Sequence, residues 1–94
     1  MATVTIYTRA LCGYCWRAVR LLRKKGVAFD EQDATGDDEL RAWLAEVTGR
    51  TTVPQVFING RAIGGSDDLA ALDRSGELDR LLAEPSVPNP TPPR

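Results

Sequence analysis

Two cysteines separated by two residues are the side chains of this chain best suited to chemistry. Cys12 and Cys15 are its only cysteines, and its 94 residues include no histidine. When a Cys-x-x-Cys pair follows a strand and opens a helix, spare backbone N–H groups and the helix dipole favour a thiolate. A thiolate attacks disulfides. The pattern therefore indicates thiol–disulfide exchange, and the lack of histidine excludes a Cys–His nucleophile pair.

The two sulfurs are expected to have different roles. We predict that Cys12, at the start of the helix, is the exposed nucleophile and that Cys15, one turn inside it, is the shielded resolving thiol. Arg9, Arg17 and Arg20 add positive charge nearby. Two alternatives stay open at this point. In the first, the two cysteines are simply small buried apolar residues. In the second, they are part of a metal site, which would have to be shared with a second chain because one chain offers two thiolates and no histidine.

Hydrophobic periodicity predicts the elements that position these cysteines. Alternating β-branched residues predict a strand at 3–8, and apolar residues at helical spacing predict a helix at 14–25, ended by Gly26. The remaining predicted elements are a strand at 27–33, a helix from an Asp37 N-cap to Gly49, a strand at 53–58, an Asn59-Gly60 turn, a strand at 61–63, a helix capped by Ser66 and running to Ser75, and a helix at 77–84.

This order, β-α-β-α-β-β-α plus a C-terminal helix, predicts an α/β fold. The first β-α-β unit requires parallel strands and the hairpin requires antiparallel ones, so we expect a mixed four-stranded sheet flanked by helices. Residues 1–84 form the expected domain. Residues 85–94 hold five of the six prolines and are expected to be disordered or extended. The inward faces of the second and third helices are predicted to be Leu40, Trp43, Leu44 and Val47, and Leu69 and Leu72.

The charge is unevenly distributed although the net charge is only −1. From Met1 to Phe29 there are six basic residues and no acidic one. The overall balance gives no reason to expect a nucleic-acid or membrane partner. No membrane span or signal peptide is visible, so a cytoplasmic location is expected, where close cysteine pairs are more often catalytic or metal-binding than structural.

Four blocks of the sequence resemble the glutaredoxin family, in the family's order. They are Tyr7-Thr8-Arg9, Cys12-Gly13-Tyr14-Cys15, Thr52-Val53-Pro54 and Gly64-Gly65-Ser66-Asp67-Asp68. The resemblance covers residues 3–84 and implies a thioredoxin-like fold, in agreement with the element order.

The resemblance also implies a glutathione site. Its residues would be Arg9, Tyr14, Arg41, Thr52, Val53, Pro54, Gly65, Ser66 and Asp67. Pro54 would be cis, leaving the Val53 backbone to pair with glutathione's cysteine. Asp67 would bind the γ-glutamyl ammonium, and Arg9 or Arg41 the glycine carboxylate. The simpler interpretations are a strand entry at Thr-Val-Pro, helix capping around Ser66, and surface positions for Arg41 and Tyr14.

The implied activity is that of a glutathione-dependent thiol–disulfide oxidoreductase. It would deglutathionylate proteins and reduce protein disulfides, with glutathione as co-substrate. Gly13 stands where many dithiol members have proline. Members with glycine or serine there include some that bind a [2Fe–2S] cluster as a dimer through the first cysteine, here Cys12, so a cluster-bridged homodimer is an alternative to a monomer. Two more candidate roles are a thioredoxin-like electron donor to a reductase and a purely structural domain.

Overall fold

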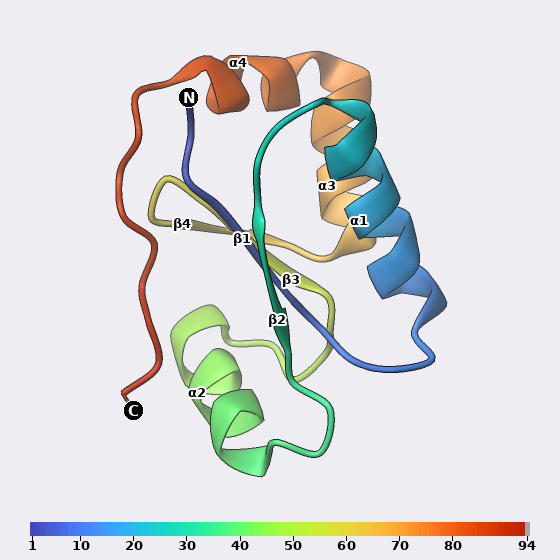
Figure 1. Ribbon diagram of the computed structural model, residues 1–94, viewed down its shortest axis with the longest axis vertical. Coiled ribbons are helices and arrows are strands. Elements are labelled where there is room, and N and C mark those ends of the chain that lie inside the picture. Colours follow the sequence, from blue (N-terminus) through green and yellow to red (C-terminus); the bar gives the residue numbers. More distant parts are fainter. Residues whose placement is uncertain (94) are drawn as a thin grey trace.

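The computed structural model describes residues 1–93 and contains four strands and four helices within them (Figure 1). Their bounds are β1 (Val4–Thr8), α1 (Gly13–Lys24), β2 (Asp30–Asp33), α2 (Asp38–Thr48), β3 (Gln55–Ile58), β4 (Arg61–Gly64), α3 (Ser66–Ser75) and α4 (Glu77–Ala83). None of the helices in this part of the chain is long and apolar enough to cross a membrane.

The strands form one mixed sheet in the order β2-β1-β3-β4. β1 runs parallel to β2 and antiparallel to β3, and β3 runs antiparallel to β4. The tight turn between β3 and β4 is formed by Asn59 and Gly60, whose φ angles are 51° and 82°, as a two-residue hairpin of this type requires. This topology confirms the predicted thioredoxin-like fold and places the carboxyl end of β1 next to the start of α1.

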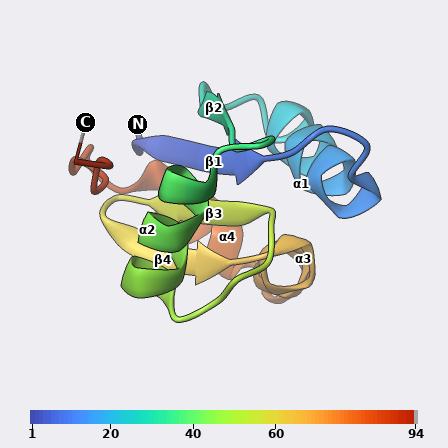
Figure 2. The same ribbon diagram turned by 90° about the horizontal axis from the view of Figure 1, so that it is seen from below.

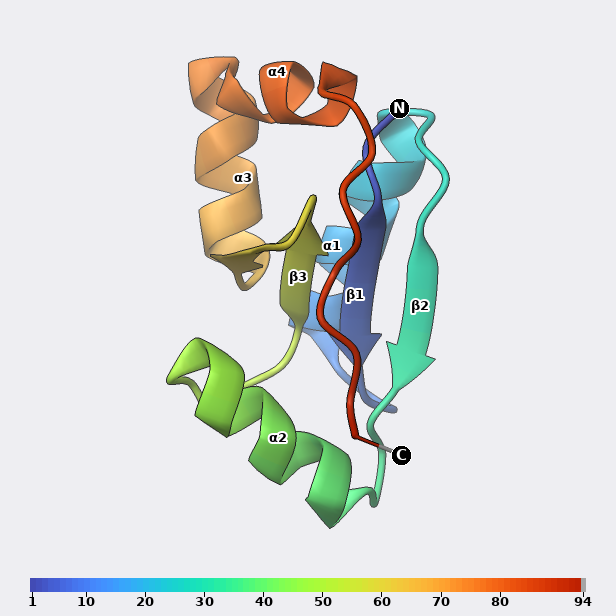
Figure 3. The same ribbon diagram turned by 90° about the vertical axis from the view of Figure 1, so that its left-hand side faces the viewer.

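Helices cover both faces of the sheet (Figures 2 and 3). One face of β1 contributes Val4 and Ile6 to a core that includes α1, α3 and α4. The other face contributes Tyr7, which packs with Phe57 and with Trp43 of α2 through edge-on ring contacts. Alternation along β1 therefore divides the core in two, as the period-two sequence pattern predicts.

Some predicted bounds and one predicted helix face are wrong in detail. β3 begins at Gln55 rather than at residue 53. β2 begins at Asp30 rather than at residue 27. Val27 and Phe29 precede it and contribute to the core without pairing as a strand. Val47 was predicted to lie on the inward face of its helix, but 42% of its surface is exposed. The buried residues of α2 are Leu40 and Leu44, so the inward face of the helix ends one turn before Thr48.

Residues 85–93 run without helix or strand beside β1, on the face of the sheet that also carries α2 (Figures 1 and 3). Asn89 holds this segment. Its Nδ2 donates to the Thr3 carbonyl (3.2 Å) and to Thr5 Oγ1 (3.0 Å), and its Oδ1 accepts from the Gly60 N–H (2.6 Å). An amide side chain therefore ties an otherwise extended segment to the sheet.

Candidate active site

Cys12 lies at the junction between β1 and α1, where it is the N-cap residue of the helix. Its sulfur accepts a hydrogen bond from the Cys15 N–H at 3.1 Å, and its side chain is partly exposed. Within the described residues, the first turn of α1 contains no acidic side chain. Because free N–H groups and the positive end of the helix dipole face this sulfur, the position stabilises negative charge on it.

Cys15 lies in a contrasting environment one turn into the same helix. It is a free thiol with 3% of its surface exposed. Burial, followed by its hydrogen bond with Cys12, raises the pKa of Cys15 from 9.0 to about 12. Cys15 is therefore a neutral thiol near pH 7. The pair consists of one accessible sulfur at a helix N-terminus and one shielded sulfur that stays protonated.

A groove of about 290 Å³ lies between the start of α1 and the start of α3. We call it the proline groove, and it is lined by Tyr14, Arg50, Thr52, Val53, Pro54, Gly65, Ser66, Asp67 and Asp68. The Val53–Pro54 peptide bond is cis, as the resemblance implied. The structure therefore brings together seven of the nine residues that were predicted to bind glutathione, from three separate parts of the chain.

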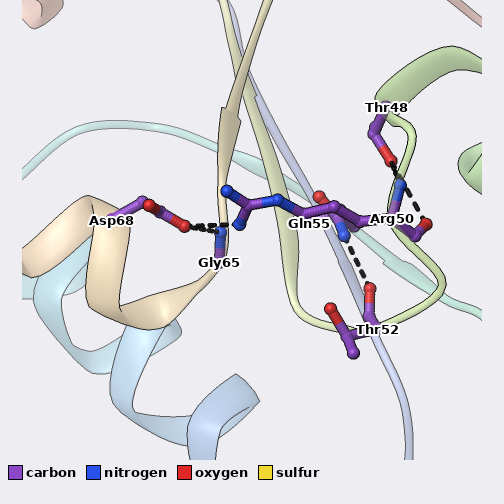
Figure 4. Close-up of polar contacts among 6 residues, drawn as sticks. All are labelled: Thr48, Arg50, Thr52, Gln55, Gly65 and Asp68. Carbon is purple, nitrogen blue, oxygen red and sulfur yellow. Dashed lines mark hydrogen bonds and ion pairs between the residues drawn. The ribbon is translucent and has the colours of Figure 1, made fainter.

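An ion pair closes one side of this groove (Figure 4). Arg50 Nη1 lies 2.6 Å from Asp68 Oδ2, and the same oxygen accepts the Gly65 N–H at 2.9 Å. These bonds, that from Arg50 first, hold the pKa of Asp68 below its ordinary value. Arg50 and Asp68 therefore place a charged pair at the rim, next to the carboxylate of Asp67.

The N-cap of α3 is Gly65, one residue earlier than predicted. Ser66 is instead the first residue of the helix. The physical reason is the reach of Asp68, whose carboxylate turns back to bond the Gly65 N–H and so fixes the start of the helix there. Ser66 and Asp67 consequently face the groove from the first turn.

Two side chains anchor the loop that carries the cis peptide bond. Gln55, 1% exposed, donates from Nε2 to the Thr52 carbonyl at 2.7 Å (Figure 4). Arg41 Nη2 donates to the Thr51 carbonyl at 3.1 Å. Arg41 is thus occupied in holding the loop, and it is not among the described residues that line the proline groove.

A second groove of about 380 Å³ includes Cys12 in its lining. We call it the cysteine groove, and it is lined by Thr8, Arg9, Leu11, Cys12, Cys15, Trp16, Val19, Arg23 and Glu31. Arg9, predicted to bind the glycine carboxylate of glutathione, therefore lines this groove and not the proline groove. Its Nη1 donates to the Ala10 carbonyl at 3.2 Å, which leaves other guanidinium N–H groups to face a ligand. Cys12 is thus accessible to a ligand from this groove.

The residues of one chain do not fit the iron–sulfur alternative by themselves. A [2Fe–2S] cluster takes four thiolates or equivalent donors. Within residues 1–93, no three side chains of the metal-binding types gather in one place, and Cys15 is buried. Cys12 is the single exposed thiol, so a second chain and further thiols would have to supply the other donors.

Sequence reasoning missed Arg50 and Gln55 as parts of the site. Gln55 follows the Thr-Val-Pro block directly, and a polar residue at the start of a strand that is otherwise apolar was a usable signal. Arg50 follows the helix-ending Gly49, and nothing local distinguishes it from a surface charge. Its role depends on Asp68, which is brought to it only by the folded chain.

Comparison with known proteins gives a consistent result. The family model described as Glutaredoxin matches residues 4–63. A glutaredoxin of Pseudomonas aeruginosa is 54% identical over 88% of this chain and 99% of its own length. Glutaredoxin 3 of Escherichia coli K12 is 52% identical over 87% and 99%, respectively. A crystal structure of a buckwheat glutaredoxin–glutathione complex superposes with a TM-score of 0.81 at 32% identity, covering 86% of this chain and 76% of that one.

Proposed function

Because this chain belongs to the glutaredoxin family of thiol–disulfide oxidoreductases, we propose that it uses glutathione to deglutathionylate proteins and to reduce protein disulfides in the cytoplasm. The observation that carries the proposal is the unequal environment of its two sulfurs. Cys12 is accessible and accepts a backbone N–H at the start of a helix, whereas Cys15 is buried with a raised pKa. One sulfur is suited to attack and the other to resolve.

Deglutathionylation needs Cys12 alone. The Cys12 thiolate attacks the glutathione sulfur of a protein–glutathione disulfide, so that this S–S bond breaks and a Cys12–glutathione S–S bond forms. The protein thiolate leaves with the electron pair and takes up a proton. A second glutathione thiolate then attacks the glutathione sulfur on Cys12. Glutathione disulfide departs and the Cys12 thiolate is restored, so one free glutathione thiol is consumed and the other half of the glutathione disulfide comes from the substrate.

Reduction of a protein disulfide needs both cysteines. Cys12 attacks one sulfur of the substrate disulfide and forms a mixed disulfide, while the other substrate sulfur leaves as a thiolate and is protonated. Cys15 then attacks the Cys12 sulfur, its proton passing to the departing substrate thiolate. The resulting Cys12–Cys15 disulfide is reduced by two glutathiones in turn. The raised pKa of Cys15 keeps it from competing as the first nucleophile.

The proline groove is the proposed place for the glutathione moiety. Glutathione carries one ammonium and two carboxylates, and the groove offers the carboxylate of Asp67 and the guanidinium of Arg50 together with the backbone of Val53. The start of α3 adds N–H donors suited to a carboxylate. The crystal structure of the buckwheat relative is a complex with glutathione, which supports this choice of ligand.

A comparison of two serine variants tests the proposal. The substrate is a glutathionylated peptide, and formation of glutathione disulfide is followed by a coupled reductase. We expect Cys12→Ser to abolish turnover. Cys15→Ser should still release glutathione from the peptide but lose the reduction of protein disulfides. Turnover that survives in Cys12→Ser would contradict the assigned roles.

The same assay separates the thioredoxin-like alternative. Electrons are then supplied by NADPH and a thioredoxin reductase, with glutathione omitted. The proposal expects turnover with glutathione and none with the reductase alone. The opposite result would favour an electron donor served directly by a reductase.

A further inference from the structure

The surface around Cys12 is unusually apolar for an exposed region. Six large apolar side chains of residues 1–93 are exposed, and three of them lie between positions 11 and 16. These are Leu11, Tyr14 and Trp16, with exposed fractions of 101%, 57% and 62%. Trp16 and Leu11 line the cysteine groove. Exposed apolar side chains gathered at one place indicate a contact surface for another molecule.

A row of cations adjoins this apolar surface along α1. The α1 cationic face consists of Arg17, Arg20, Arg23 and Lys24, all exposed. Residues three or four positions apart on a helix are neighbours, so Arg20 adjoins Trp16, Arg17 and Lys24, and Arg23 borders the cysteine groove. The positively charged side chains therefore extend along α1 from the neighbourhood of Cys12 towards the end of the helix.

The cations of this face have no acidic partner within residues 1–93. The ion pairs of this part of the chain involve Lys25, Arg50 and Arg80. Lys25, the next residue along α1, pairs with both Asp73 and Asp79. The fold thus neutralises the lysine that faces α3 and α4 and leaves the outer cations uncompensated.

Two aromatic rings hold two arginines of this face, Arg17 and Arg20, in place. The guanidinium carbon of Arg17 lies 5.6 Å from the Tyr14 ring centroid, and that of Arg20 lies 5.1 Å from the Trp16 centroid. A cation on a ring face loses little of its capacity to donate hydrogen bonds from its edge. Arg17 and Arg20 are therefore partly ordered before any partner arrives, which lowers the entropic cost of binding an anion.

We propose that the cysteine groove and the α1 cationic face dock an acidic segment of the protein whose sulfur reacts at Cys12. This inference rests on the proposed function and names its substrate class. A polypeptide fits better than other polyanions, because the groove joins the cations to the reactive sulfur and to the apolar Leu11 and Trp16. Glu31 is the one acidic residue that lines the groove, and it disfavours an acidic side chain at that end, so the acidic residues lie over α1.

The inference is tested by binding, which needs no turnover. Three fluorescein-labelled peptides of equal length carry a serine in place of the reacting cysteine, flanked on one side by glutamates, by lysines or by uncharged residues. Fluorescence anisotropy with the whole protein gives their dissociation constants. We expect the acidic peptide to bind most tightly and to lose affinity as salt rises, since exposed charges are screened.

Charge reversal on the cationic face provides the decisive comparison. Arg20→Glu should weaken binding of the acidic peptide by about three- to tenfold at low salt. Arg61→Glu is the matched control. It makes the same change of charge at an exposed residue of β4. Arg61 pairs with Ile58, which pairs with Val4 at the start of β1, so it lies at the end of the sheet away from Cys12. The Arg61→Glu variant should bind the acidic peptide like wild type. Thermal unfolding of both variants verifies that they are folded.

Three results would overturn the inference. Equal affinity for the three peptides, or equal effects of the two variants on binding, would show that the α1 cationic face does not dock an acidic segment. Equally tight binding of a single-stranded oligonucleotide of the same charge would make the face a general polyanion site. Turnover of an uncharged glutathionylated peptide is measured beside these and decides the proposed function alone, so failure of the one is distinguishable from failure of the other.

Discussion

The two cysteines differ because one turn of helix separates two electrostatic environments. Cys12 faces the N–H groups that the start of α1 leaves unpaired, and Cys15 is buried one turn further along the helix. Desolvation disfavours a buried thiolate, whereas an N–H donor stabilises an exposed one. The division of labour between the sulfurs therefore comes from position and not from residue type.

The raised pKa of Cys15 predicts a specific dependence of stability on pH. The unfolded thiol ionises near 9.0 and the folded one near 12, so the unfolded state binds fewer protons between these values. The contribution of Cys15 is therefore complete below pH 9 and is lost as the pH rises towards 12, with a slope of at most about 1.4 kcal/mol per pH unit.

Urea unfolding under reducing conditions at pH 7 to 10.5 measures this contribution. Wild type should lose stability more steeply than Cys15→Ala over the upper part of the range. Parallel curves for the two proteins would show that Cys15 ionises as readily in the folded chain as in the unfolded one.

Replacing Arg50 with glutamine should raise the pKa of Asp68 towards its ordinary value of 3.8, because the bond from Arg50 is the largest cause of the depression. Stability from this pair is complete above the ordinary value and is lost as the pH falls through the folded one. Both side chains are about half exposed, so the loss at pH 7 should stay below about 1 kcal/mol.

The carboxyl carbon of Asp68, followed by NMR against pH, reports the effect directly. Arg61→Gln serves as the control, since it removes an exposed arginine outside the proline groove. An unchanged Asp68 titration in Arg50→Gln would mean that the Gly65 N–H alone stabilises the carboxylate.

At the scale of elements, the site depends on how two helices and a loop begin and end. α1 begins at Cys12, α3 begins at Gly65, and the Thr52–Pro54 loop is held by Gln55 and Arg41. Each of these ends presents backbone groups that regular structure leaves unpaired. The candidate active site therefore consists of the ends of several elements, which lie together where β1 ends and β3 begins.

Gly64 is the position at which this arrangement is most sensitive to substitution. Its φ angle is +117°, and a Cβ there would overlap the Asp68 carboxylate that caps α3. Gly64→Ala should lower the free energy of unfolding by about 1–3 kcal/mol. Denaturant unfolding measures the loss.

Gly13→Ala is the matched control, because no atom lies within 4 Å of a Cβ built at Gly13 and its φ is not positive. Its stability should stay within about 0.5 kcal/mol of wild type. Similar losses in the two variants would show that the cap tolerates displacement of Asp68.

For the molecule as a whole, the C-terminal segment connects distant parts of the sheet. Asn89 bonds groups at the start of β1 and the turn between β3 and β4, and the Val87 N–H donates to Asn59 Oδ1 at 3.1 Å. These contacts lie at the end of the sheet opposite Cys12. These hydrogen bonds therefore stabilise the fold, and none of residues 85–93 lines the proline groove or the cysteine groove.

Asn89→Ala should lower the free energy of unfolding by about 1–2 kcal/mol, because it removes these bonds and leaves the Gly60 N–H without its partner. In a domain of this size the melting temperature should fall by about 4–16 °C. Calorimetry measures the shift, and hydrogen exchange of the Gly60 amide measures its lost protection.

Thr91→Ala in the same segment is the control and should leave both readouts unchanged, since Thr91 is exposed. Full protection of Gly60 in Asn89→Ala would show that the segment does not hold the turn.

Much of this protein follows from short stretches of its sequence. The strand before Cys12, the helix after it, the Asn59-Gly60 turn and the alternation along β1 all express preferences that act within a few residues. Even the unequal sulfurs follow from their order at a helix start. These local rules are sufficient for the mixed sheet and for the choice of the reactive pair.

The remaining features were decided only by tertiary structure. Four of them depend on residues that are distant in sequence. They are the ion pair of Arg50 with Asp68, the position of Arg9 in the cysteine groove, the hydrogen bond from Arg41 to the Thr51 carbonyl and the hydrogen bonds of Asn89. A long polar side chain finds its partner through the spatial arrangement of whole elements. Local periodicity specifies that arrangement only approximately, so sequence identified which residues are charged and the fold determined what each charge binds.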